Sequence, residues 1–187
     1  MSQVKKLHCS LLELKKLYSL TSIAMLLAIR VVLGFFANTT LAFFGNNVKI
    51  SGAFLPIAVT AQMFGPIPAA LVGALGDIIS FMLNPTGGAY FPGFTISGLL
   101  TGVIYGLAFY KSKPTISRVT IAWFINMVVV ETFLAAYWLY VLNGATAPYT
   151  FYLSARFISV AVKCIPEILL IFTTGKIVEQ INKALHR

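Results

Sequence analysis

The sequence predicts an all-α integral membrane protein with six transmembrane helices and with both termini in the cytoplasm. First, 58% of its 187 residues are hydrophobic and only 10% are charged, whereas soluble domains carry about 25% charged residues. Second, long stretches with few or no charges recur six times along the chain. Third, the basic residues gather in three clusters that six spans would place on one side, and the positive-inside rule makes that side cytoplasmic.

The first element expected is an amphipathic cytoplasmic segment, residues 1–18. Leu7, Leu11, Leu14 and Tyr18 recur at helical spacing opposite the lysines, so this segment is expected to lie along the inner membrane surface. No small-residue cleavage site follows a short apolar core, so no cleavable signal is expected. A six-helix membrane domain (19–178) and a cytoplasmic tail (179–187) complete the predicted organisation.

Six segments of the membrane domain contain at most two charged residues each and are expected to span the bilayer. The second is short against the roughly 20 residues that cross a membrane, so it is expected to be broken, tilted or shielded by its neighbours. The segments between spans one and two, three and four, and five and six carry almost no charge and are expected to face outward. The spans are Leu17–Phe44, Ile50–Met63, Pro66–Met82, Tyr90–Tyr110, Val119–Leu142 and Phe157–Thr174.

The second outward loop, Asn84–Thr95, contains two prolines and three glycines. Such a composition is unsuited to a spanning helix in lipid, so the loop is expected to lie outside the hydrocarbon or to line a cavity. Tyr90, Phe91 and Phe94 supply aromatic surface, and Asn84 and Thr95 supply hydrogen-bonding groups. A tight turn is expected at Pro92 and Gly93. The loop is therefore either part of a binding site or an interfacial turn with an aromatic belt.

Ionisable residues inside spans are costly and therefore mark candidate functional sites. Arg30, Asp77, Glu131 and Lys163 are all expected near mid-depth, where they either form neutral buried pairs, such as Arg30 with Asp77, or face a pocket. In span six, Arg156, Lys163 and Glu167 are spaced by seven and four residues, which places them on one helical face. This face would attract an anionic ligand from the outside, unless Arg156 reaches lipid headgroups and Lys163 pairs with Glu167.

Other classes of function are disfavoured by the sequence. Thr174-Gly-Lys-Ile177 lacks the upstream glycine and the magnesium-binding hydroxyl of a nucleotide-binding loop. No nucleophile-elbow, metalloprotease or paired-carboxylate pattern occurs, so an enzyme is not expected and no catalytic residue or cofactor is assigned. The two histidines lie near opposite termini, so no metal site is expected. The net charge of +9 follows membrane topology rather than one soluble face, so no nucleic-acid partner is expected.

Six sequence blocks together resemble the substrate-binding S components of energy-coupling factor (ECF) vitamin transporters. The resemblance runs from about Ala24 to Glu167, and the fourth and fifth blocks look most like the folate-specific branch. The blocks are Phe54-Leu-Pro56, Phe64-Gly-Pro66, Gly73-Ala-Leu-Gly-Asp77, Tyr90-Phe-Pro-Gly-Phe-Thr95, Leu100-Thr-Gly-Val-Ile-Tyr-Gly106 and Arg156-x6-Lys163-x2-Pro166-Glu167.

The resemblance implies a vitamin-binding subunit of the bacterial plasma membrane that associates with a transmembrane coupling subunit and two ATPases. In that family an Ala-x-x-x-Ala pattern on the first helix contacts the coupling subunit, and the matching residues here are Ala24 and Ala28. We also keep open an S component for another vitamin, such as pantothenate, and a membrane scaffold without transport function.

Folate, as bound substrate, fits the chemistry of the candidate residues. A flat pterin requires aromatic faces and in-plane polar partners, and a glutamate tail requires cations. We hypothesise that Tyr90, Phe91 and Phe94, with the adjoining Pro92 and Gly93, enclose the ring system. Asn84, Thr95 and Glu131 would bond its polar edges. Arg156 and Lys163 would bind the carboxylates.

Overall fold

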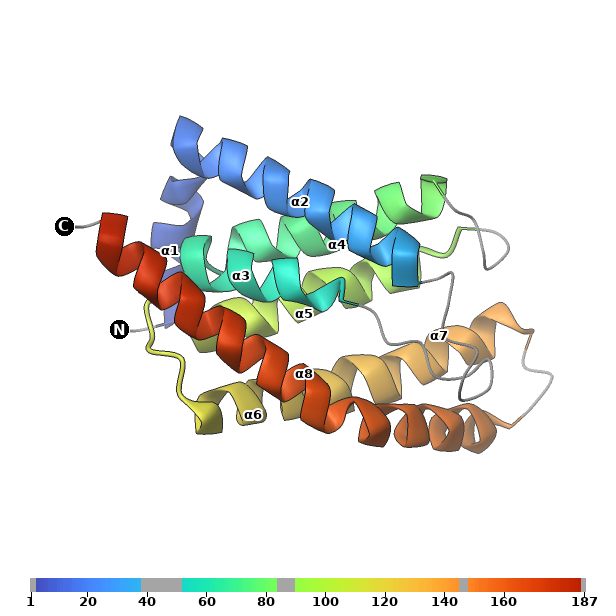
Figure 1. Ribbon diagram of the computed structural model, residues 1–187. Coiled ribbons are helices and arrows are strands. Elements are labelled where there is room, and N and C mark those ends of the chain that lie inside the picture. The colour runs from blue at the N-terminus through green and yellow to red at the C-terminus, as the bar shows by residue number, and fades with distance from the viewer. Residues whose placement is uncertain (1–2, 38–51, 84–89, 145–147, 186–187) are drawn as a thin grey trace.

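The computed structural model describes residues 3–37, 52–83, 90–144 and 148–185, and all regular secondary structure in these ranges is helical (Figure 1). Three of the elements, α6, η2 and α7, follow one another without a break, and η2 is a π-helical segment. The elements are α1 (Gln3–Glu13), α2 (Leu17–Ala37), α3 (Phe54–Phe64), α4 (Pro66–Leu83), α5 (Pro92–Phe109), α6 (Ile116–Asn126), η2 (Met127–Leu134), α7 (Ala135–Leu142) and α8 (Tyr149–Leu185).

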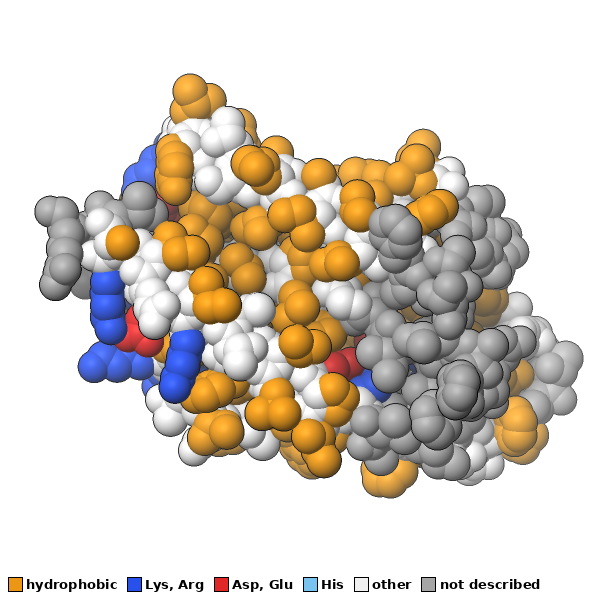
Figure 2. Space-filling model, viewed as in Figure 1, with side chains coloured by type: hydrophobic (Ala, Val, Ile, Leu, Met, Phe, Trp, Pro, Cys, Tyr) orange, Lys and Arg blue, Asp and Glu red, His pale blue; other side chains and the backbone are white. Residues whose placement is uncertain are grey.

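Four helical stretches in the described ranges are long and apolar enough to cross a membrane: Leu17–Phe35, Pro66–Leu83, Pro92–Phe109 and Ile116–Leu142. Helix α3 is also apolar but has only 11 residues, or about 16 Å of rise, so the second predicted span is indeed short. Hydrophobic side chains cover much of the surface seen in Figure 2. Water disfavours such a surface and lipid does not, so this is a multi-pass membrane protein.

Helices α4 and α5 pack backbone against backbone. A side chain added at Gly73 would collide with the backbone of Gly98, and one added at Gly102 would collide with the backbone of Ala69. Small residues allow this approach in membranes, where close van der Waals packing stabilises helix pairs. The glycine and alanine residues of the predicted third span therefore have a structural role.

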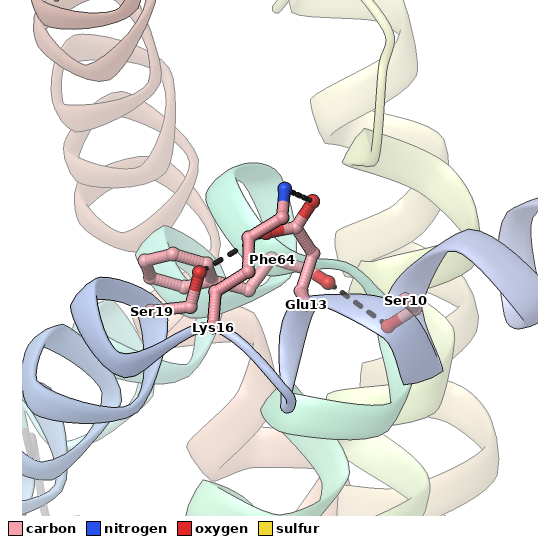
Figure 3. Close-up of polar contacts among 5 residues, drawn as sticks. All are labelled: Ser10, Glu13, Lys16, Ser19 and Phe64. Carbon is pink, nitrogen blue, oxygen red and sulfur yellow. Dashed lines mark hydrogen bonds and ion pairs between the residues drawn. The ribbon is translucent and has the colours of Figure 1, made fainter.

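Helix α1 attaches to the turn between α3 and α4 (Figure 3). The Ser10 hydroxyl is fully buried, donates to the Phe64 carbonyl oxygen at 2.9 Å and accepts from the Ile67 amide at 3.2 Å. Glycine suits this turn for two reasons. The φ of Gly65 is +95°, which other residues rarely adopt, and a side chain there would collide with Ser10. In the same view Glu13 binds both Lys16 and Ser19 and joins the end of α1 to the start of α2.

Helix α1 turns a polar face toward the protein and part of its leucine face outward. Lys6 is buried, with 8% of its surface exposed, whereas Leu7 and Leu11 are 38% and 50% exposed. The buried face of α1 is polar because it meets backbone carbonyl groups at the ends of other helices, including Leu107, whose oxygen accepts from the Lys6 ammonium at 2.8 Å. Leu7 and Leu11 remain free to contact the membrane surface, whereas Leu14 lies beyond the end of α1 and packs against the core.

Figure 1 shows α1 and the end of α8 at the same end of the molecule, opposite the end where α4 and α7 finish and α8 begins. Basic side chains gather at the first of these ends (Figure 2). The cavity described next lies nearer the second end. Helix α8 also changes direction along its course (Figure 1) and contains Pro166, which cannot donate a backbone hydrogen bond.

Candidate functional site

A cavity of about 250 Å³ lies among the helices and is bordered by charged side chains of both signs. Every membrane-crossing element contributes to its wall, so the cavity requires the whole bundle. Its lining residues are Arg30, Ala53, Phe54, Ile57, Asp77, Phe94, Ser97, Gly98, Thr101, Asn126, Met127, Val130, Glu131, Ala135, Arg156, Lys163 and Glu167.

Helix α8 brings three charged residues to this cavity: Arg156, Lys163 and Glu167. The helical spacing of seven and four residues predicted this shared face. Lys163 and Glu167 are 9% and 4% exposed. The Glu167 carboxylate accepts from the Trp123 indole N–H at 2.8 Å. No ion pair within 4.0 Å joins Lys163 to Glu167 in the described part of the chain, so the two opposite charges line the cavity without the direct contact considered from the sequence.

The π-helical segment η2 brings Glu131 to the cavity wall beside α8. Met127, Val130 and Glu131 all line the cavity from η2. A π-helix has more residues per turn than an α-helix and shifts the face that its side chains occupy, and such segments occur frequently at functional sites. The Glu131 carboxylate lies 4.0 Å from Arg156 Nη1, so the two predicted site residues Glu131 and Arg156 are neighbours.

Arg30 and Asp77 both line the cavity, but they have separate hydrogen-bond partners. Arg30 donates to the carbonyl oxygens of Val72 and Gly73 on α4. The Asp77 carboxylate accepts from the Thr95 hydroxyl at 2.7 Å. The described residues contain no ion pair between Arg30 and Asp77 within 4.0 Å. The two opposite charges therefore face the same cavity without a direct ion pair, and each is bound by backbone or hydroxyl groups.

The prediction that the loop continues to Thr95 is wrong, because α5 begins at Pro92. Pro92 and Gly93 form the first helical turn instead of a tight turn. The physical reason is that proline fits the first turn of a helix, where its missing N–H would have no partner, and its fixed φ favours helix. The segment Pro92–Thr95 is therefore a helix start at the cavity, and its side chains are positioned by α5.

The aromatic residues at this helix start form a cluster beside the cavity. Phe91 contacts Phe94 and Trp138, with ring centroids 6.1 and 5.6 Å apart. A side chain at Gly93 would collide with Phe91 and Trp138, so glycine permits this packing. The Tyr90 hydroxyl lies 2.6 Å from the Thr95 hydroxyl, which links Tyr90 through Thr95 to the cavity residue Asp77.

The predicted site residues thus divide into three groups. Phe94, Glu131, Arg156 and Lys163 line the cavity. A second group lies next to it, either in contact with lining residues or at the start of α5: Phe91, Pro92, Gly93 and Thr95. Tyr90 is linked to the cavity through Thr95. Asn84 lies outside the described residues.

Several cavity residues were absent from the predicted site. Arg30, Asp77 and Glu167 were detectable as intramembrane charges but were not assigned to it. Asn126 is 3% exposed, and its side-chain oxygen is a buried acceptor without a hydrogen-bond partner in the described structure. Its signal would have been a lone amide in the otherwise apolar segment Ile121–Met127.

A multi-pass helical bundle with a cavity of mixed charge defines a membrane protein built to hold a polar ligand within a membrane-embedded domain. Comparison with known proteins narrows this class. A model of the family described as "ECF transporter, substrate-specific component" matches residues 18–178. The chain belongs to this family, which confirms the resemblance found in its sequence blocks.

Individual relatives agree with the family match. The chain is 35% identical over 135 residues to the "Folate transporter FolT" of Clostridium novyi (strain NT), which covers 72% of this chain and 77% of the relative. It is 32% identical over 119 residues to the "Folate transporter FolT" of Leuconostoc mesenteroides subsp. mesenteroides, which covers 63% of this chain and 60% of the relative. A solved structure described as "Crystal structure of FolT bound with folic acid" matches with a TM-score of 0.75 and 30% identity, covering 86% of this chain and 94% of that one.

Proposed function

We propose that this chain is the folate-binding substrate-specific component of an ECF-type importer in a bacterial plasma membrane. The observation that carries the proposal is the cavity, where Arg156 and Lys163 lie with Glu131 and Glu167 in a chain of this family. Folate needs cations for its glutamate carboxylates and a carboxylate or amide for the N–H groups of its pterin, and this cavity offers both. The similarity to two folate transporters favours folate over pantothenate.

The roles within the site follow from charge and position. Arg156 and Lys163 bind the carboxylates of the glutamate tail. Glu131 accepts from the polar edge of the pterin, and Phe94 provides an aromatic face. Tyr90 and Phe91, with the adjoining Pro92 and Gly93, help to enclose the ring system, and Asn84 and Thr95 form hydrogen bonds with its polar edges.

The membrane topology proposed is six spans with both termini in the cytoplasm. Helix α3 and helix α8 add to the four long apolar stretches, and α8 has 37 residues, ample to cross a bilayer despite its charges. Charges in α8 are tolerated because they face the cavity rather than lipid. Helix α1 and the end of α8 lie together on the basic side, as the positive-inside rule requires for a cytoplasmic face.

ATP-driven transport requires partners because the sequence contains no nucleotide-binding loop. We propose a transmembrane coupling subunit and two ATPases as these partners, with α2 as the contact helix. Ala24 and Ala28 are both exposed on one face of α2, and small residues four apart let another helix approach closely. Substitution of a large residue at this face would therefore prevent assembly without altering the cavity.

Proteoliposomes that contain this chain, the coupling subunit and the two ATPases test the function. Wild-type protein is expected to accumulate radiolabelled folic acid only with ATP inside the compartment that the ATPases face. Ala28→Trp is expected to retain folic acid binding but to lose uptake and co-purification with the coupling subunit. Uptake of labelled pantothenate with no uptake of folic acid would overturn the assignment of the vitamin, and co-purification of no partner by the wild type would support the scaffold alternative.

A further inference from the structure

A second groove, of about 740 Å³, lies between α1, α5 and α6 and is separate from the folate cavity. It contains Lys6 of α1, Leu107 of α5 and Arg118 of α6, and shares no lining residue with the first cavity. The mechanism proposed above uses none of its residues. Its composition changes along its length, from cationic and hydroxyl groups at one end to aliphatic side chains at the other.

The polar end of the groove has an excess of positive charge. Lys6 and Arg118 line it together with the hydroxyl-bearing Ser112, Thr115 and Ser117, and none of its lining residues is a carboxylate. Burial and the charge of Arg118 both lower the pKa of Lys6, which means that the two cations repel each other through a partly desolvated space.

The start of α6 adds to this positive potential. The helix begins at Ile116, and its N-cap residue Thr115 makes no side-chain capping hydrogen bond, so the first amide groups have no side-chain acceptor from the cap. Arg118 lies in the first turn, where the helix dipole favours an anion and not a cation. An anion bound here would interact favourably with Lys6, Arg118 and the helix start at once.

The other end of the groove is aliphatic and open to the membrane. It is lined by Ile104 of α5 and by Ile121 and Ile125 of α6. Ile121 and Ile125 are 60% and 45% exposed. From Ser117 to Ile125 the rise along α6 is about 12 Å, so the groove extends from the polar end well into the hydrocarbon region.

We propose that this groove binds an anionic phospholipid from the leaflet that adjoins α1, with its phosphate between Lys6 and Arg118 and one acyl chain along Ile104, Ile121 and Ile125. A free phosphate would contact only the cations, and the acyl chain of a neutral lipid would contact only the aliphatic wall. A basic pocket between transmembrane helices is a recognised form of lipid headgroup site, and here both parts of the lipid have a complementary surface.

Native mass spectrometry of the delipidated full-length protein tests this site. The protein is titrated with phosphatidylglycerol and, separately, with phosphatidylcholine of the same acyl chains. Arg118→Gln and Lys6→Gln are each expected to weaken phosphatidylglycerol binding about fivefold. Lys15→Gln is the matched control, because it removes one exposed cation from the same end of the molecule outside the groove, and it is expected to bind like the wild type.

A second variant covers the possibility that Lys6→Gln disturbs the fold by loss of its bond to α5. Ser117→Phe retains both cations and places a ring in the groove, so it is expected to block phosphatidylglycerol binding. Because Ser117 is exposed, the thermal unfolding temperature is expected to stay unchanged. Equal binding of both lipids, equal weakening by Lys15→Gln, or full competition by soluble glycerol phosphate would overturn the proposal. So would a Ser117→Phe protein that keeps the lipid but no longer binds the coupling subunit, which would make the groove a protein interface.

Discussion

Replacement of Lys163 by methionine tests the predicted carboxylate site most sharply. Methionine has a similar length and no charge, so Lys163→Met removes the ammonium with little change in packing volume. Lys163 lines the cavity and the residue is 9% exposed, so water replaces its ammonium poorly when a ligand carboxylate is bound. Glu167 retains its bond from Trp123 at 2.8 Å in this variant.

The expected loss of affinity follows from the energy of a buried, charge-assisted hydrogen bond. Such a bond contributes about 1.5–3 kcal/mol, which corresponds to a roughly 10- to 150-fold higher Kd for folic acid. Pteroic acid lacks the glutamate tail, so its Kd is expected to change less. The difference between the two ligands separates a direct contact with the tail from a general disturbance of the cavity.

Isothermal titration calorimetry of detergent-purified protein from folate-depleted cells provides the assay. Lys176→Met is the matched control, because it removes the same charge from an exposed position on the same helix, outside the cavity, and its Kd is expected to equal that of the wild type. The reasoning is refuted if folded Lys163→Met protein binds folic acid with the wild-type Kd, or if folic and pteroic acid lose affinity equally.

Three further variants test one close helix contact and two buried hydrogen bonds, each by the change in thermal unfolding of the purified protein. Gly102→Ala is expected to destabilise by about 1–3 kcal/mol because its methyl group would collide with the backbone of α4, whereas Gly52→Ala, with ordinary contact distances, is expected to be neutral. Trp123→Phe removes the donor to the buried Glu167 and is expected to cost about 1.5–3 kcal/mol; an unchanged unfolding temperature would contradict this bond. Ser10→Ala leaves the Phe64 carbonyl and the Ile67 amide without their partner and is expected to cost about 1–3 kcal/mol. It is also expected to speed hydrogen exchange in α1, because Ser10 attaches that helix to the turn between α3 and α4.

The parts of the site that depend on helical periodicity were predictable from the sequence. Arg156, Lys163 and Glu167 share a face because of their spacing alone, whatever the neighbouring helices do. Glu131 and Asp77 were detectable because a charge within an apolar segment is costly unless it faces a cavity or a partner. The family was predictable because several short blocks occurred in the right order over most of the chain.

Other features depend on interactions that the sequence pattern does not encode. Pro92 is compatible both with a turn and with the first residue of a helix. In the structure it begins α5, next to the packing of Phe91 against Trp138. The π-helical segment η2 has no compositional signature, although it determines where Glu131 lies. The partners of Arg30 are backbone carbonyl groups of α4, and backbone groups are the same in every sequence.

Equilibrium binding of folic acid to the isolated wild-type chain tests the central claim most directly. The measurement uses calorimetry in detergent, without nucleotide and without the coupling subunit or ATPases. The account predicts saturable binding of one folic acid per chain, because the cavity is built from residues of this chain alone. Absence of binding by protein that unfolds cooperatively, or binding of pantothenate in place of folic acid, would contradict it.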